Sequence, residues 1–362
     1  MRVLILDQYS DRGGGQRMLL ESLCAIRERG WNALVALPGK GSMFEEVAAL
    51  GFRTSHIDCG PYSSGKKSAA DAIRFALELP ALAGQIADLT DRFAPDLLYI
   101  NGPRVLPGAF LARRQTPVLF HAHTALPSVA QRWLSGIVLR EMNAEVVAVS
   151  NSVAECWRRF ARVSVVYNGV TGPFCAPRPR PEGPPRVGCI GRISPEKGQR
   201  EFLRVAARIL ETIPDARFLV YGAALFGDTT AEQYEKEIRA AAESMPVEFP
   251  GWVHDVYEAF ANLDLLLVPS VWQEPNALVI LEAFAAGVPV IAFRTGGIPE
   301  FLDQVCDTTE EMAQLAVDVL RDPAYHGRLA RAGSEAWQRN FHPSRYRQQI
   351  AEAMLAAIKA SR

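Results

Sequence analysis

Short apolar runs alternate with helical patterns along the whole chain. In the first half the runs are rich in Val, Leu and Ile and lack polar alternation, as in strands that are buried on both faces of a sheet. They cover Val3–Leu6, Ala33–Leu37, Leu97–Ile100, Val118–Phe120 and Glu145–Val149. Helical patterns between them include Gly15–Arg29 and Ala69–Phe93. This order predicts βα units on a parallel sheet.

A proline-rich segment interrupts the rhythm. Residues 171–186 hold six prolines in sixteen positions, a density that neither a helix nor a central strand tolerates. Strands are predicted again at Arg186–Ile190, Arg217–Tyr221, Leu265–Val268 and Val288–Ala292, and a helix at Pro343–Lys359.

The chain is therefore predicted to fold as two α/β domains. The first covers 1–170, the linker 171–186 and the second 187–342, and the C-terminal helix at 343–362 is expected to pack back toward the first domain. Ligands bind such doubly wound sheets at the carboxyl ends of the strands. We therefore expect two Rossmann-like domains that face each other across a ligand-binding cleft.

Composition and charge narrow the class of protein. The 362 residues are 49% hydrophobic and 22% charged, which is typical of a globular chain. A net charge of +4 over residues 1–170 and −5 over the rest leaves open ordinary surface variation or contact of the first domain with an anionic membrane surface. No nucleic-acid partner is expected.

The cysteines and the N-terminus indicate the cellular compartment in which the protein is expected. The six cysteines show neither CxxC nor metal-ligand spacing, which favours a reducing cytosol over a zinc site or a disulfide framework. The start MRVLILD has no signal-peptide pattern, and no apolar stretch approaches the roughly 20 residues that span a bilayer. We predict a soluble cytoplasmic protein that at most lies on the cytoplasmic face of a membrane.

Two glutamates with seven residues between them carry the clearest chemical pattern, in the segment PSVWQEPNALVILEAFAAG. Pro275 suits the first turn of a helix, so Glu274 is expected just before the helix and Glu282 two turns into it, roughly 12 Å further along. One carboxylate can then meet a sugar and the other a ribose, with phosphates between them at the helix N-terminus. Either glutamate alone is better explained as a solvated residue at a helix end, whereas the pair in this strand–loop–helix setting favours the functional interpretation.

Two cations, Arg192 and Lys197, stand between a strand and a helix, where they can converge on a diphosphate. The alternative is that they are surface charges at the start of a helix. Because no Asp-x-Asp follows a strand, we expect no metal.

The first domain has candidate ligand-binding residues of two types, glycines and histidines. Gly13, Gly14 and Gly15 lie between a strand and a helix and allow a close approach of a ligand to the backbone. Their spacing departs from GxGxxG, which disfavours a nicotinamide dehydrogenase. His121 and His123 follow a strand and point to the same side if the chain is extended. An HxH metal site would need further ligands at matching spacing, and the sequence offers none.

These segments together resemble the retaining family 4 glycosyltransferases, which have the GT-B fold. The E-x7-E pair is followed by a match to EAxAxGxPV. Further matches, in order along the chain, are GGGQR from Gly13, Val166–Val170, Gly191–Gly198, Pro250–Asp255, Glu282–Val290 and Thr295–Glu300. They extend over nearly the whole chain.

The resemblance implies a retaining hexosyltransferase that moves a sugar from a nucleotide-diphospho-sugar to a carbohydrate or glycolipid acceptor, in polysaccharide, lipopolysaccharide or other glycan biosynthesis, with no cofactor or metal. It implies catalytic roles for His123, Glu274, Arg192 and Lys197. The residues that it implies for donor binding are Gly14, Gly15, Arg192, Lys197, Gly222, Trp252, Val253, Glu274, Pro275, Asn276, Ala277, Leu278 and Glu282.

Individual roles follow from the same resemblance. Glu274 would bind hydroxyls of the donor sugar and Glu282 the ribose, and Gly296-Gly297 would let the backbone approach the donor. No candidate nucleophile emerges, which favours a front-face reaction in which the leaving phosphate accepts the acceptor's proton. Pro275-Asn276-Ala277 replaces the Phe-Gly pair of many members, which leaves the identity of the sugar open.

Alternatives remain at this point. A nucleotide-sugar epimerase or a non-catalytic GT-B protein that binds nucleotide sugars would share the fold. The stretch Ser128–Arg140 could be an amphipathic surface for peripheral membrane contact, or a helix that packs on its own sheet.

Overall fold

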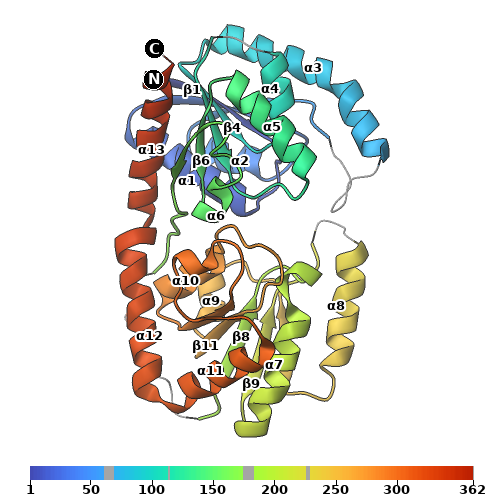
Figure 1. Cartoon of the computed structure of the whole chain (residues 1–362), viewed down its shortest axis with the longest axis vertical. Helices are drawn as coiled ribbons and strands as arrows, with labels where there is room; N and C mark the ends of the chain where they lie inside the picture. The colour runs from blue at the N-terminus through green and yellow to red at the C-terminus, as the bar shows by residue number, and fades with distance from the viewer. Residues whose placement is uncertain (61–68, 113–114, 174–182, 226–228, 362) are drawn as a thin grey trace. The chain divides into compact units, whose positions relative to one another are not determined.

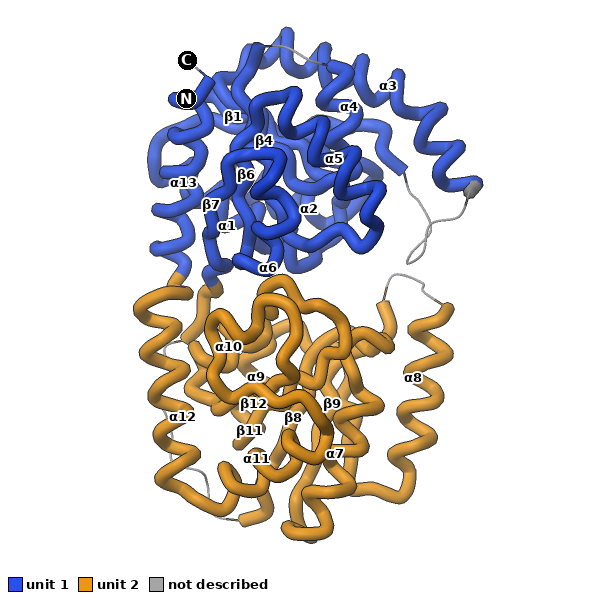
Figure 2. Tube along the Cα trace, in the orientation of Figure 1, with its two compact units in different colours: residues 1–169, 343–362 blue, residues 170–342 orange. Residues whose placement is uncertain are grey.

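The computed structural model describes residues 1–60, 69–112, 115–173, 183–225 and 229–361. The chain forms two compact units (Figure 2): unit 1 contains Met1–Gly169 and Pro343–Arg362, and unit 2 contains Val170–His342. Residues 174–182, most of the predicted linker, lie outside the described residues.

Unit 1 is built on a seven-stranded sheet in the order β3-β2-β1-β4-β5-β6-β7, with every neighbouring pair parallel. Its strands are β1 (Arg2–Asp7), β2 (Asn32–Leu37), β3 (Arg53–His56), β4 (Leu97–Asn101), β5 (Val118–Ala122), β6 (Glu145–Ala148) and β7 (Arg162–Val165). The five predicted strands are the five central ones. The two edge strands, β3 and β7, were not predicted, because their half-exposed residues break the apolar pattern.

Helices cover both faces of this sheet (Figure 1). The helices of unit 1 are α1 (Gly14–Glu28), α2 (Met43–Ala49), α3 (Ala69–Phe93), α4 (Leu106–Leu111), α5 (Val129–Glu141), α6 (Asn151–Ala154) and α13 (Pro343–Ala360). Apolar residues of α3, α4 and α5 form a core with Leu4, Ile100 and Phe120 of the sheet. Since side chains alternate along a strand, Ile5, Tyr99 and His121 point to the opposite face.

The C-terminal helix α13 belongs to unit 1. It packs along α1 and contacts β4, β5 and β6. The hydroxyl of Tyr346, which is buried, lies 2.8 Å from Ser22 Oγ, and Arg347 donates to Glu21 and Glu28 at 2.7 Å each. Polar as well as apolar contacts therefore fix α13 on the face that also carries α1.

Unit 2 has a six-stranded parallel sheet in the order β10-β9-β8-β11-β12-β13. Its strands are β8 (Arg186–Ile190), β9 (Arg217–Tyr221), β10 (Val247–Gly251), β11 (Leu265–Val268), β12 (Val290–Phe293) and β13 (Val305–Cys306). Its helices are α7 (Gln199–Thr212), α8 (Thr229–Ala241), α9 (Val256–Phe260), α10 (Leu278–Ala286), α11 (Thr309–Arg321) and α12 (Pro323–Ala336), with short turns η1 (Pro195–Lys197), η2 (Ile298–Glu300) and a π-helical turn η3 (Trp337–Phe341). Helices α7, α8 and α11 share a core with one face of the sheet.

Helix α10 begins later than predicted. Pro275 lies in the preceding loop rather than in the first turn, because Ala277 is still extended (φ −71°, ψ 101°) and caps a helix that starts at Leu278. Glu282 is therefore only one turn into the helix, not two.

None of the helices in the described parts of the chain has the length and apolar character needed to cross a membrane.

Candidate active site

The loop between β11 and α10 holds Glu274 at the carboxyl edge of the sheet of unit 2. Its side chain is buried and accepts hydrogen bonds from Ser270 Oγ at 3.0 Å and from the ammonium of Lys197. Its backbone carbonyl accepts from Gly297 N–H at 2.7 Å. Both the carboxylate and the main chain of Glu274 are thus fixed by neighbouring loops.

Lys197 comes from the loop that follows β8. The two predicted cations have different surroundings. Lys197 is partly buried against Glu274, whereas Arg192 is exposed. The ammonium of a lysine can donate three hydrogen bonds, so the contact with Glu274 leaves donors for an anion. The two sequence motifs GRISPEKG and E-x7-E therefore meet in one ion pair.

Glu282 is buried on the first turns of α10, four residues past the start of the helix. Asn276 and Ala277, which the sequence places in the same donor-binding set, are buried in the loop before it, while Pro275 and Leu278 are partly exposed. The strand, loop and helix thus carry both glutamates in one continuous segment of unit 2.

Close backbone approaches hold the surrounding loops together. Gly198 has φ +72°, and a Cβ there would lie 1.9 Å from the carbonyl oxygen of Pro269. A Cβ on Gly296 (φ +54°) would lie 2.1 Å from the carbonyl oxygen of Glu274. Gly222, predicted to bind the donor, has φ +152° and packs in the same way on the carbonyl of Gly191. These glycines let the loops after β8, β9, β11 and β12 touch one another.

The remaining predicted donor residues of unit 2 follow the edge strand β10. Trp252 is half exposed and Val253 is partly buried. A second tryptophan, Trp272, is equally exposed in the loop before Glu274. That loop is fixed by a hydrogen bond from Val271 N–H to the carbonyl of Glu196 at 3.0 Å.

In unit 1 the sheet carries a polar network at its carboxyl edge. Asp7 ends β1 and Asn101 ends β4, and the two residues are partners in the parallel register. Asn101 Nδ2 donates to Asp7 at 2.6 Å, and Asn101 Oδ1 lies 2.7 Å from Nε2 of His123, one residue past β5. The sequence prediction included His123 but missed Asp7 and Asn101. Their signal is a polar residue at the end of each of two strands, directly after a run of buried apolar residues.

The two histidines occupy different surroundings. His121 is fully buried, and its Nδ1 lies 2.5 Å from the hydroxyl of Tyr99. His123 is partly exposed, and the two ring centroids are 3.9 Å apart. Burial lowers the pKa of His121 well below its ordinary value, and the neighbouring His123 lowers it further. Of the two, His123 is the ring that a ligand can reach.

The glycines after β1 begin helix α1 beside this histidine. Gly13 caps the helix, and Gly14 and Gly15 are its first two residues. A Cβ on Gly15 would lie 3.3 Å from Cδ2 of His123, so the absence of a side chain lets the ring pack on the start of the helix. Both predicted glycines therefore lie at the carboxyl edge of unit 1, Gly15 in contact with the predicted histidine.

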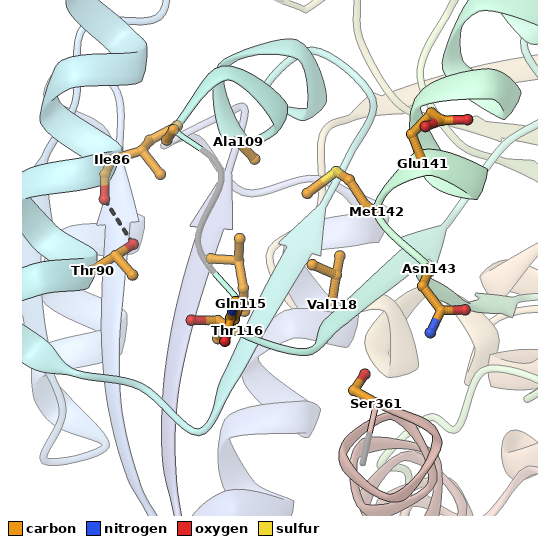
Figure 3. Close-up of a pocket in the computed structure, with 12 residues that line it drawn as sticks. Ile86, Thr90, Ala109, Gln115, Thr116, Val118, Glu141, Met142, Asn143 and Ser361 are labelled. Atoms are coloured by element: carbon orange, nitrogen blue, oxygen red, sulfur yellow. Dashed lines mark hydrogen bonds between the residues drawn. The ribbon is translucent and has the colours of Figure 1, made fainter.

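A cavity of about 240 Å³ lies at the opposite, amino edge of the same sheet (Figure 3). It is lined by residues that include Ile86, Thr90 and Val118, the first residue of β5. Thr90 Oγ1 donates to the carbonyl of Ile86 at 2.8 Å. The cavity is therefore separate from the residues that the sequence singled out.

Within the described residues, no group of three or more His, Cys, Asp or Glu side chains is placed to hold a metal ion. The cysteines at 24, 59, 156, 189 and 306 are free thiols, and Cys175 lies outside the described residues.

Both units are similar to known proteins. Residues 12–171 match the family described as Glycosyltransferase Family 4, and residues 184–322 match Glycosyl transferases group 1. The glycogen synthase of Mycobacterium tuberculosis strain H37Rv is 29% identical over 75% of this chain and 72% of its own. The phosphatidyl-myo-inositol mannosyltransferase of Mycobacterium leprae is 26% identical over 94% and 92%.

Among solved structures, Anabaena Alr3699/HepE in complex with UDP and glucose is similar at a TM-score of 0.79, with 23% identity over 98% of this chain and 100% of that one. This likeness confirms the predicted fold class, two parallel sheets flanked by helices as in GT-B proteins. The two family matches together extend over most of the chain, and the chain belongs to the family 4 glycosyltransferases.

Proposed function

We propose that this glycosyltransferase is a retaining enzyme that binds a nucleotide-diphospho-sugar on unit 2 and transfers the sugar to a carbohydrate or glycolipid acceptor bound on unit 1, in glycan or glycolipid biosynthesis. The observation that carries the proposal is the ion pair between Lys197 and Glu274, held at the carboxyl edge of the sheet with Glu282 on the following helix. Sheets of this kind bind their ligands at that edge.

The charges at this edge suit the parts of such a donor. Lys197 and Arg192 supply positive charge for the diphosphate, Glu282 binds the ribose, and Glu274 accepts hydrogen bonds from sugar hydroxyls. Because Glu274 already accepts from Ser270 and Lys197, its orientation is set before a sugar arrives. Preorganised groups of this kind lose little entropy when a ligand binds.

The proposed chemistry uses no covalent intermediate. The bond between the anomeric carbon and the β-phosphate oxygen breaks while the acceptor oxygen bonds to the same face of the sugar. The proton of the acceptor hydroxyl moves to the departing β-phosphate. Lys197 and Arg192 would offset the charge that develops on this leaving group, a role that a divalent metal can fill in other enzymes. The reaction is therefore expected to proceed without metal.

A titration of candidate donors tests the proposal. Wild type and Glu282→Gln are titrated calorimetrically with UDP-, GDP- and ADP-sugars in EDTA, beginning with UDP-glucose, since Alr3699/HepE has been solved with that compound. We expect one nucleotide to bind and Glu282→Gln to weaken it at least about tenfold, because a neutral amide replaces a buried acceptor of two ribose hydroxyls.

Glu243→Gln is the matched control, since Glu243 is an exposed glutamate of unit 2 and should retain wild-type affinity. If no nucleotide sugar binds, or if both variants bind as the wild type does, the assignment of the donor site is wrong.

A surface on α5 supports peripheral membrane contact by unit 1. Val129 and Leu134 are 60% and 65% exposed, and Trp133 and Ile137 lie on the same side of the helix. Leu139, on the other side of the helix, is buried in the core of unit 1, so Leu134 and Ile137 face outward, while the ring of Trp133 packs edge-on against Phe160 and is 45% exposed. Residues 101–170 carry eight Lys or Arg against three Asp or Glu, so anionic lipid headgroups on the cytoplasmic face of a membrane are the proposed partner.

Co-sedimentation with vesicles tests this contact. The wild type should bind vesicles of phosphatidylglycerol and phosphatidylcholine more strongly than pure phosphatidylcholine, and salt should weaken the binding. Val129→Ser with Leu134→Ser should reduce it several-fold, whereas Val271→Ser, which changes a 52% exposed residue of unit 2, should not. Equal binding by all variants, or no binding at low salt, would overturn the proposal.

A further inference from the structure

The polar network at the carboxyl edge of unit 1 has a defined hydrogen-bond direction. The hydrogen bonds that neighbouring described residues make to the Asp7 carboxylate come from N–H groups, among them the backbone of Tyr9 at 3.0 Å, Gln16 Nε2 at 3.0 Å and Asn101 Nδ2 at 2.6 Å. An ionised carboxylate only accepts hydrogen bonds. The amide of Asn101 must therefore turn its NH₂ toward Asp7.

This orientation of Asn101 determines which nitrogen of His123 carries the proton. With its NH₂ on Asp7, Asn101 presents its carbonyl oxygen to Nε2 of His123 at 2.7 Å. That oxygen only accepts, so Nε2 must donate and carries a hydrogen. The reversed amide would place its oxygen against the carboxylate of Asp7, where two acceptors would repel each other at hydrogen-bonding distance.

The other ring nitrogen of His123 is left as an acceptor. His123 is mostly buried with part of its surface accessible, and this burial lowers its pKa to about 4, so the ring is neutral at physiological pH and holds a single proton. With that proton on Nε2, Nδ1 has a lone pair. Among the residues that the structure describes, the only hydrogen bond of the His123 ring is the one to Asn101, and the ring is partly exposed.

We propose that Asp7 and Asn101 are positioning residues that hold His123 as the Nε2–H tautomer, so that Nδ1 accepts a hydrogen bond from a hydroxyl group of the bound sugar substrate. The identity of the ligand as a sugar rests on the proposed function, whereas the tautomer does not. A hydroxyl can donate to Nδ1, but a phosphate oxygen without a proton is repelled by the lone pair. His123 therefore recognises the sugar part of a substrate rather than its phosphates, and no proton is transferred.

Substitutions at Asp7 and Asn101 should change the tautomer of His123 in a predictable way. In Asp7→Asn, the new amide keeps its oxygen for Tyr9 and Gln16 and turns its NH₂ toward Asn101, which must reverse and present its own NH₂ to His123. Nε2 then becomes the acceptor and the proton moves to Nδ1. The double variant Asp7→Asn with Asn101→Asp restores an acceptor opposite Nε2, since the carboxylate introduced at position 101 accepts from both neighbours.

Nitrogen NMR of the full-length protein labelled with ¹⁵N-histidine tests the proposal at pH 7.5. Two-bond proton–nitrogen correlations identify which ring nitrogen is protonated, and His123→Gln assigns the signals. The wild type should show the Nε2–H pattern, Asp7→Asn the Nδ1–H pattern, and the double variant the Nε2–H pattern again. Asp58→Asn, which changes an exposed carboxylate of unit 1, should leave the pattern of His123 unchanged.

A purely structural role for Asp7 and Asn101 would leave the tautomer unchanged in Asp7→Asn. That result, or an Nδ1–H or doubly protonated ring in the wild type, would overturn the proposal. If Asp7→Asn does not fold, an Nδ1–H or doubly protonated ring in the double variant would still overturn the proposal.

Turnover of the nucleotide sugar that binds in the donor panel, together with titration of its free nucleoside diphosphate, provides the functional readout. Asp7→Asn should lower kcat/KM for sugar transfer about tenfold, with recovery in the double variant, while the affinity of unit 2 for the free nucleoside diphosphate stays the same. An equal loss of affinity for the nucleoside diphosphate would contradict the assignment of His123 to a sugar hydroxyl. If no nucleotide binds at all while the NMR patterns hold, the proposed function fails and the tautomer control stands.

Discussion

At the scale of single residues, the ion pair between Lys197 and Glu274 is the most constrained feature of unit 2. Glu274 is buried and depends on Ser270 and Lys197 for its hydrogen bonds. Removing the cation from a buried carboxylate costs more than the pair itself contributes, because the remaining charge has lost its partner. The pair should therefore show strong coupling in stability as well as in donor binding.

A double-mutant cycle measures this coupling. Lys197→Met alone should lower the free energy of unfolding by about 2–3 kcal/mol, and Lys197→Met with Glu274→Gln by less, since the double variant leaves no buried charge. Urea unfolding of Lys197→Met, Glu274→Gln and the double variant, followed by circular dichroism, gives the three differences from the wild type. Additive effects would show that the pair is not coupled.

Asp7 should make stability depend on pH. Burial raises its pKa from the ordinary 3.8 to about 6, against the opposing effect of hydrogen bonds from Asn101, Tyr9 and Gln16. Between these values the folded state binds a proton that the unfolded state has released, so stability falls as pH rises from about 4 to 6 and is level above. Relative to Asp7→Asn, the wild type should lose roughly 3 kcal/mol over that range.

Urea unfolding of both proteins between pH 4 and 7.5 tests this linkage. Every other titrating group is common to the two proteins, so their difference isolates Asp7. A difference that does not change with pH would mean that Asp7 titrates normally in the folded state.

At the scale of elements, the sequence predicted the strands that are buried on both faces of the sheets and missed the strands that are partly exposed. The predicted strands are nearly continuous apolar runs. The missed strands β3, β7 and β10 consist of partly buried and exposed residues, and the missed strand β13 is only two residues long. The start of α10 was misplaced because Pro275 is equally compatible with a loop. Asp7 and Asn101 were not predicted as site residues, because their contact depends on the register between β1 and β4, which local sequence patterns do not specify.

A substitution at Gly198 tests how much the close contact between the loops after β8 and β11 contributes to stability. Gly198→Ala should destabilise the protein by roughly 2–4 kcal/mol, because it combines a positive φ with a clash against the carbonyl of Pro269. Gly251→Ala is the control, since Gly251 also has positive φ (+89°) but open space around it, and should cost about 1 kcal/mol. Thermal unfolding of both variants gives the comparison, and equal losses would show that the close approach to Pro269 is unimportant.

At the scale of the whole molecule, the chain returns to unit 1 after completing unit 2. Helix α13 buries Tyr346, Ile350 and Met354 against unit 1 and contributes no residue to unit 2. The stability of unit 1 therefore depends on the last twenty residues of the chain, although the candidate donor residues Lys197, Glu274 and Glu282 lie outside them.

Deletion of residues 343–362 should separate the stability of unit 1 from nucleotide binding by unit 2. Loss of the buried side chains of α13 should destabilise unit 1 by roughly 5 kcal/mol or more. Unit 2 should still bind the nucleoside diphosphate that the donor panel identifies. Calorimetric unfolding with and without this nucleotide checks both points. An unchanged unfolding profile would show that α13 is dispensable for unit 1.

The central claim, retaining transfer from a nucleotide sugar without metal, is tested most directly by proton NMR of the sugar released when water replaces the acceptor. Wild-type protein is incubated in EDTA with the α-linked nucleotide sugar that binds in the donor panel. We expect slow release of the α anomer first, ahead of mutarotation, and loss of this release in Lys197→Met. Initial release of the β anomer, or consumption of the donor only when a divalent metal is added, would contradict it.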